Sequence, residues 1–163
     1  MRKMFADMPL KNPMLSMLLG VLALSAAIFG YLGLSNWMAQ YSDVYSIIMY
    51  ISSILYFMPI VTHHVFCGTV EWFYIRLGRT DEARDAVLEF QKKTMITMYI
   101  GYIALIVFAA ALFIAVVTGI TALPRWACIF NTLPLFILLL PTKLPAKGNI
   151  AGAIMFLGLL FFI

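Results

Sequence analysis

The sequence predicts an all-α integral membrane protein, a polytopic helical bundle with about five transmembrane spans. Of its 163 residues, 64% are hydrophobic and only 11% are charged, whereas about a quarter of an ordinary soluble domain is charged. A chain of this length cannot hide so much apolar surface in a core, so lipid must solvate much of it. Long charge-free runs and a one-sided distribution of basic residues support the same class.

The spans are placed where charge-free runs approach the roughly 20 helical residues that cross a hydrocarbon core. They are expected at about 14–34, 44–75, 94–118, 126–141 and 148–163. Five is a minimum, because the apolar end at Ile163 is compatible with a natural chain that continues into further spans. Residues 1–163 are treated as a single transmembrane domain.

Two of these spans contain residues that interrupt helices. Pro59 lies inside the second span and should kink it, because the proline ring clashes with the preceding turn. A straight helix over 44–77 would be about 50 Å long, well beyond a core of about 30 Å. Asn131 and Pro134 lie in the middle of the fourth span. Freed backbone groups at membrane depth need protein or a cavity around them, so both interruptions predict an internal pocket.

Basic residues alternate between connections, which predicts the orientation. The N-terminus and the connections 76–93 and 142–148 hold ten of the eleven Lys and Arg residues, and Arg125 lies on the other side. The positive-inside rule therefore places the N-terminus in the cytoplasm. We expect a multi-pass protein of a bacterial plasma membrane, and the net charge of +4 does not indicate nucleic-acid binding.

Residues 80–93 are expected to form a short amphipathic helix on the cytoplasmic membrane surface. Thr80 or Asp81 can cap its N-terminus, and Lys92 and Lys93 suit the negative end of its dipole. This helix would connect the second span to the third.

A cluster of chemically active side chains lies in the segment "HHVFCGTVEWFY". On a helix, His64, Cys67, Gly68 and Glu71 share one face, and His63 points elsewhere. His64 and Glu71 are two turns apart, about 10 Å along the axis. Gly68 leaves room between them, so the two groups could hold one small molecule. An ionisable group within a span is costly and by default faces the bundle interior or a cavity.

This cluster predicts acid–base chemistry on an apolar molecule. The Glu71 carboxyl and the His64 imidazole could add a proton to a substrate and remove one elsewhere, as in the isomerisation of a lipid double bond. These two are the candidate catalytic residues. The candidate ligand-binding residues are His63, Cys67, Gly68, Trp72 and Asn131.

A structural role for the same residues stays open. If the second span ends near Thr62, both histidines and Glu71 lie at the cytoplasmic interface and contact headgroups or basic side chains. A metal site is not expected, because the histidines and Cys67 supply only two or three ligands and no second Cys/His set follows. No cofactor is expected.

Residues 63–74 resemble the His…Glu-Gly-Trp-Phe region of the sterol-isomerase and sigma-2-receptor (EXPERA) group of small multi-span proteins. The resemblance implies an apolar ligand that meets carboxylates inside a bundle of four or five helices. In that group the acid follows the His by four residues, whereas Glu71 follows His64 by seven and no Gly precedes Trp72. The chain as a whole resembles uncharacterised bacterial multi-span proteins.

Three functions are compatible with these observations. The favoured one is the binding, with or without isomerisation, of a small lipid-like molecule in an intramembrane pocket. The first alternative is a transporter or channel for small solutes or ions, which broken helices favour. The second is a non-catalytic accessory subunit. The expected partners are membrane lipids and the lipid-like molecule but no nucleic acid, and a homo-oligomer is compatible with the sequence.

Overall fold

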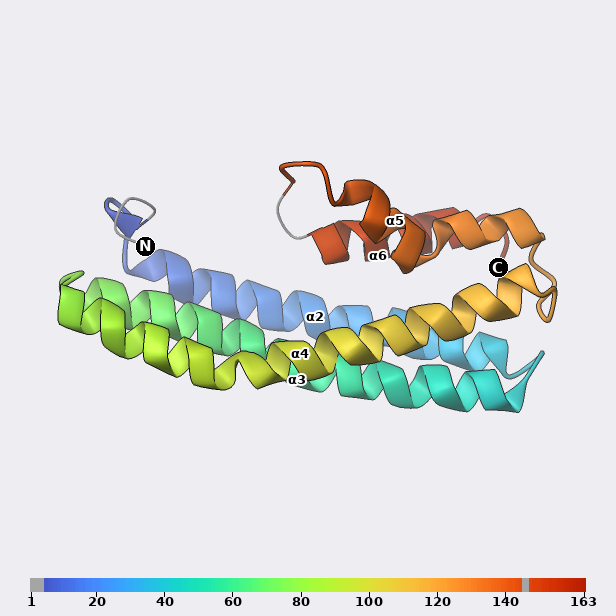
Figure 1. Cartoon of the computed structure of the whole chain (residues 1–163), viewed down its shortest axis with the longest axis horizontal. Helices are drawn as coiled ribbons and strands as arrows, with labels where there is room; N and C mark the ends of the chain where they lie inside the picture. Colours follow the sequence, from blue (N-terminus) through green and yellow to red (C-terminus); the bar gives the residue numbers. More distant parts are fainter. Residues whose placement is uncertain (1–4, 145–146) are drawn as a thin grey trace. The chain divides into compact units, whose positions relative to one another are not determined.

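The protein is built from helices. A computed structural model describes residues 5–144 and 147–163, and all regular secondary structure within them is helical (Figure 1). The helices are α2 (Lys11–Met38), α3 (Asp43–Arg76), α4 (Asp81–Val117), the 3-10 helix η1 (Arg125–Phe130), α5 (Thr132–Leu139) and α6 (Lys147–Leu159). Within the described residues, α2, α3 and α4 are the three helices long and apolar enough to cross a membrane. The predicted helical class is confirmed, and these helices indicate a membrane protein.

The chain forms two compact units. The first unit combines Met1–Ile28 with Ile54–Ile103, and the second combines Phe29–Ser53 with Ala104–Ile163. Each long helix contributes residues to both units, so neither unit is a single continuous segment. In the first unit, stretches of α2, α3 and α4 lie side by side (Figure 1).

Helix α3 continues through Pro59, the residue at which a kink is expected. It runs for 34 residues with this proline inside. The missing proline N–H removes one backbone hydrogen bond from the helix. One turn later, the Thr62 hydroxyl donates to the Met58 carbonyl at 3.0 Å. The whole segment from His63 to Glu71 is therefore part of one continuous helix.

Helix α4 also continues where a boundary was expected. The predicted surface helix over 80–93 and the predicted third span form one helix of 37 residues. Thr80 caps it as expected, because its hydroxyl accepts the Ala83 N–H at 3.1 Å. Ala83 and Val87 are buried against α3. These two apolar residues therefore pack against protein, whereas Ala86 and Phe90 of the same segment are exposed. The position of the segment on a membrane surface stays a prediction.

The predicted fourth span is divided into two short helices. Residues 125–130 form η1, Asn131 is extended, and α5 has only eight residues. Pro134 lies in the first turn of α5, where proline is tolerated. At 1.5 Å per residue, α5 is about 12 Å long and α6 about 20 Å, and a hydrocarbon core measures about 30 Å. Five spans are therefore not established.

The turn between α3 and α4 holds the N-terminal segment in the first unit. Gly78 and Arg79 have φ angles of 78° and 60°, and the Arg79 N–H donates to the Tyr74 carbonyl, which is the hydrogen bond of a Schellman motif. The Arg79 guanidinium donates to the Phe5 carbonyl at 2.8 Å and the Met8 carbonyl at 2.9 Å. The N-terminal segment is thereby attached to the end of α3.

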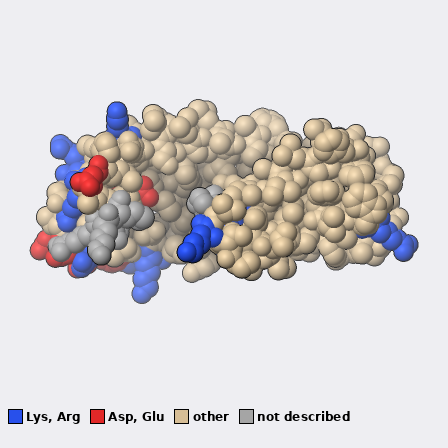
Figure 2. Space-filling view, turned by 90° about the horizontal axis from the view of Figure 1, so that it is seen from above, with Lys and Arg blue, Asp and Glu red and all other residues tan. Residues whose placement is uncertain are grey.

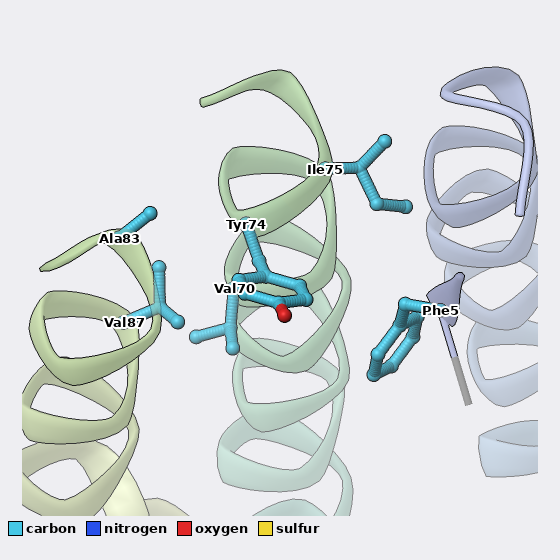
Figure 3. Packing of buried hydrophobic residues seen from close by; sticks show 6 residues of the cluster. All are labelled: Phe5, Val70, Tyr74, Ile75, Ala83 and Val87. Carbon is cyan, nitrogen blue, oxygen red and sulfur yellow. The ribbon is translucent and has the colours of Figure 1, made fainter. Parts of the chain in front are cut away.

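A buried apolar cluster lies beneath this turn. It consists of Phe5, Val70, Tyr74, Ile75, Ala83 and Val87 (Figure 3). The Phe5 and Tyr74 rings meet edge to face with centroids 6.1 Å apart. Within the first unit, charged side chains gather around the α3–α4 turn, and uncharged residues cover most of the visible face (Figure 2).

The second unit packs through small residues and aromatic rings. Tyr31 lies against Phe108 and Phe156, with ring centroids 4.9 and 5.1 Å apart. Gly152 and Gly158 on α6 let neighbouring rings approach closely, because an added Cβ would meet the Tyr31 hydroxyl or the Phe130 ring. Close approach of backbones through small residues is the usual packing mode of helices in lipid.

Candidate functional site

The candidate site lies in the first unit, where α3 presents His63, Cys67 and Glu71 at intervals of four residues. Residues four apart on a helix are neighbours on its surface. The Cys67 Sγ lies 3.4 Å from the His63 Nε2. The Glu71 carboxyl interacts electrostatically with both Cys67 and His64. The row covers about 12 Å of helix. His63 was predicted to point away from this group, and its contact with Cys67 corrects that prediction.

His63 also connects α3 to α4. Its Nδ1 lies 3.1 Å from the Thr97 hydroxyl oxygen. That hydroxyl donates its one hydrogen to the Thr94 carbonyl at 2.7 Å, so it can only accept from His63. His63 Nδ1 is therefore the protonated nitrogen and Nε2 is the acceptor. The Cys67 S–H then donates to Nε2, which gives a directed chain from thiol to imidazole to hydroxyl.

Glu71 forms no hydrogen bond or ion pair with the other residues that the structure describes, 5–144 and 147–163. Its side chain is partly buried. The exposed acids Asp81, Asp85 and Glu89 of α4, in contrast, all form ion pairs. A carboxyl without a partner on an apolar helix is costly and marks a functional candidate.

His64 points toward α2. Its Nε2 lies 3.0 Å from the Ser16 carbonyl oxygen, and only a protonated nitrogen can donate to that oxygen. In the neutral imidazole, Nδ1 is then the nitrogen with a free lone pair. The ring lies directly over Gly20, where an added Cβ would collide with it. His64 thus has one nitrogen fixed by α2 and one available for chemistry.

The other predicted ligand-binding residues have different surroundings. The space expected beside Gly68 is occupied by the Met17 side chain of α2. Trp72 is partly buried and meets its neighbour Phe73 with ring centroids 5.0 Å apart. Gly68 therefore serves close packing of two helices, and the described contact of Trp72 is with Phe73.

Asn131 belongs to the second unit and caps α5. Its side-chain oxygen accepts the Leu133 N–H at 2.9 Å, and its amide nitrogen donates to the Ala109 carbonyl at 2.8 Å. The side chain is buried, with 3% exposed. Both ends of the amide already have protein partners, so the observed role of Asn131 is structural.

Comparison with known protein families assigns the chain to a family. The family model DUF6796, described as a family of unknown function, matches residues 1–163. The chain belongs to DUF6796. Neither a curated protein nor a solved structure matches it. The resemblance of residues 63–74 to the sterol-isomerase group stays a prediction.

This DUF6796 protein also uses site residues that the sequence reading did not select. Thr97 fixes His63, and Ser16 fixes His64. Thr94 and Thr97 are neighbours on one face of α4, at the start of its apolar part, which could have indicated a polar contact to the cluster. The Ser16 contact uses a backbone carbonyl, which no side-chain pattern reveals. Among the described residues, no three His, Cys, Asp or Glu side chains lie close enough to hold a metal ion.

Proposed function

We propose that this protein binds a small lipid-like apolar molecule beside Glu71 and His64 and exchanges protons with it. The observation that carries the proposal is the Glu71 carboxyl, which is partly buried on an apolar helix and forms no hydrogen bond or ion pair with the other described residues. A ligand that meets this carboxyl would offset the cost of leaving it unpaired.

The two groups divide the chemistry between them. The Glu71 carboxyl delivers a proton to one carbon of an unsaturated substrate, and His64 Nδ1 removes a proton from another carbon. Donation from His64 Nε2 to the Ser16 carbonyl supports this role, because it fixes the tautomer with a free Nδ1. The product is an isomer with a shifted double bond. At the end of the step the Glu71 carboxyl has lost a proton and His64 has gained one.

A matched pair of substitutions tests the binding site. Glu71→Gln removes the unpaired carboxyl, and Glu89→Gln removes an exposed carboxyl that pairs with Lys93. After purification of the full chain in mild detergent, native mass spectrometry should detect a co-purified lipid-like molecule on the wild type and on E89Q. Its occupancy should fall about tenfold on E71Q, because the contact between the Glu71 carboxyl and the ligand is worth about 1.4 kcal/mol. Equal occupancy in all three proteins would contradict the proposal.

We also propose that α2, α3 and α4 each cross the membrane, with the N-terminus and the α3–α4 turn in the cytoplasm. Hydrogen bonds from Arg79 to the Phe5 and Met8 carbonyls support a shared side for these two segments. The excess of basic residues in both supports the cytoplasmic side. Three crossings are proposed in place of five, because α5 and α6 are shorter than the core is thick.

Labelling from outside the cell tests this orientation. Single cysteines are introduced as Gln40→Cys in the α2–α3 connection and Glu82→Cys at the start of α4, in a chain that lacks Cys67 and Cys128. A membrane-impermeant maleimide should label Q40C on intact cells and E82C only after permeabilisation. The reverse pattern would overturn the orientation, and labelling of both on intact cells would overturn the crossing by α3.

The transporter alternative loses part of its support. It was based on breaks in the second and fourth spans, and α3 is continuous from Asp43 to Arg76. No contact of the described residues favours the accessory-subunit alternative. Neither is proposed here.

A further inference from the structure

A second set of chemical groups in the first unit has no part in the proposed function. The thiol of Cys67, the imidazole of His63 and the hydroxyl of Thr97 form a continuous hydrogen-bonded chain across α3 and α4. We propose that Cys67 is a nucleophile that accepts an acyl group from a long-chain acyl thioester. His63 is its general base, and Thr97 is a positioning residue. Neither Glu71 nor His64 takes part in a step of this reaction.

Comparison of the two cysteines shows why Cys67 is singled out. Both are free and partly exposed. Cys128 lies in η1, and its sulfur has no hydrogen-bond partner among the described residues. Cys67 has an imidazole nitrogen at 3.4 Å, and that imidazole is in turn held by a third group. A nucleophile, a base and an orienting group in contact are the arrangement that activates a thiol.

The direction of the hydrogen bonds is the one that this chemistry requires. Thr97 donates its hydrogen to the Thr94 carbonyl and therefore fixes the proton of His63 on Nδ1. The lone pair of Nε2 then faces the thiol. When Nε2 takes the thiol proton, the Nδ1–H···O bond to Thr97 is kept and holds the imidazolium in place.

The surroundings select an apolar acyl group. Phe66, which precedes Cys67, meets Phe90 of α4 edge to face with ring centroids 5.4 Å apart. No Lys or Arg occurs in residues 44–75, so this part of α3 favours the uncharged acyl group over the charged part of the thioester. A long acyl chain can lie in lipid beside the helix while its carbonyl carbon reaches the sulfur.

The step balances without an oxidant or reductant. The Cys67 sulfur attacks the carbonyl carbon of the acyl thioester, and its proton moves to His63 Nε2. A tetrahedral intermediate forms and collapses with cleavage of the original carbon–sulfur bond. The leaving thiolate takes the proton back from His63 Nε2. The products are an acyl thioester on Cys67 and one free thiol, and no atom changes oxidation state.

Labelling with an alkyne-tagged palmitoyl thioester of coenzyme A tests the proposal on the purified full chain. We expect the tag on the wild type and on Cys128→Ala, its release by neutral hydroxylamine, and its absence from Cys67→Ala. His63→Gln should slow labelling about 100-fold, as expected for loss of a general base. Peptide mass spectrometry of the wild type should place the acyl group on Cys67, which requires no variant to fold.

Three results would overturn the proposal. These are an unlabelled wild type, equal labelling of Cys128, or a His63→Gln rate equal to that of the wild type. The role of Thr97 has its own test. Thr97→Val should slow labelling and change its pH profile, and Thr97→Ser, which keeps the hydroxyl, should restore both. Circular dichroism and the elution volume of each variant monitor the fold, and an unchanged rate in a folded Thr97→Val protein would remove Thr97 from the mechanism.

Discussion

The two compact units differ in how their buried polar groups are hydrogen-bonded. In the second unit, buried hydroxyl and amide groups bond to backbone: Ser35 and Ser53 donate to the carbonyls of Tyr31 and Met49, and Asn131 bridges two segments. In the first unit, ionisable side chains are partly buried, and Glu71 forms no hydrogen bond or ion pair with the other described residues. Satisfied polar groups stabilise a bundle, whereas unsatisfied ones mark places where binding or chemistry compensates the cost.

The largest effect should come from the second unit. Asn131→Ala removes the cap of α5 and the bond to the Ala109 carbonyl. Together these losses should lower the free energy of unfolding by about 3 kcal/mol. The measurement is denaturant unfolding in mild detergent. Asn149→Ala, at an exposed position of α6, is the matched control. Equal stability of the two variants would contradict the stabilising role of the buried Asn131 amide.

An intermediate effect is expected where α2 meets α3 in the first unit. Gly20→Ala forces the His64 ring from its place and breaks its bond to the Ser16 carbonyl. Overpacking of this kind should cost about 2 kcal/mol. Gly33→Ala, with nothing within 4 Å of the added carbon, should instead be neutral or slightly stabilising.

A double variant tests whether Gly20→Ala destabilises the protein through the collision with His64 or through an effect of alanine that does not depend on His64. Gly20→Ala combined with His64→Ala removes the colliding ring, so its unfolding midpoint should return part of the way to that of His64→Ala alone. If the added methyl group costs the same with and without the imidazole, the described contact is not the cause.

The smallest effect should be a gain. The Tyr74 side chain is fully buried, and its hydroxyl has no hydrogen-bond partner among the described residues. Tyr74→Phe removes this unsatisfied group and should raise the free energy of unfolding by about 1 kcal/mol. Tyr102→Phe, at a site that is 42% exposed, is the control. A loss of stability in Y74F would show that the hydroxyl has a hydrogen-bond partner in the folded protein.

The sequence was sufficient to predict the long apolar helices and the Thr80 cap, because composition and capping residues act locally. It was insufficient for the fourth and fifth spans, since apolar runs alone do not reveal that Asn131 ends one short helix and caps another. The predicted direction of the His63 side chain was wrong for a similar reason. Residues four apart on a helix differ in direction by only about 40°, so His63 can reach Cys67. Its contact with Thr97 on α4 cannot be read from the sequence of α3.

The hydrogen bonds of Arg79 set a sequence of events during synthesis. They join this residue to backbone carbonyls 74 and 71 positions earlier. The segment that contains Phe5 and Met8 leaves the ribosome first, yet it cannot be fastened until α2, α3 and the following turn have been made. A nascent chain released before Arg79 would therefore keep its amino-terminal end untethered, however well its first helix had inserted.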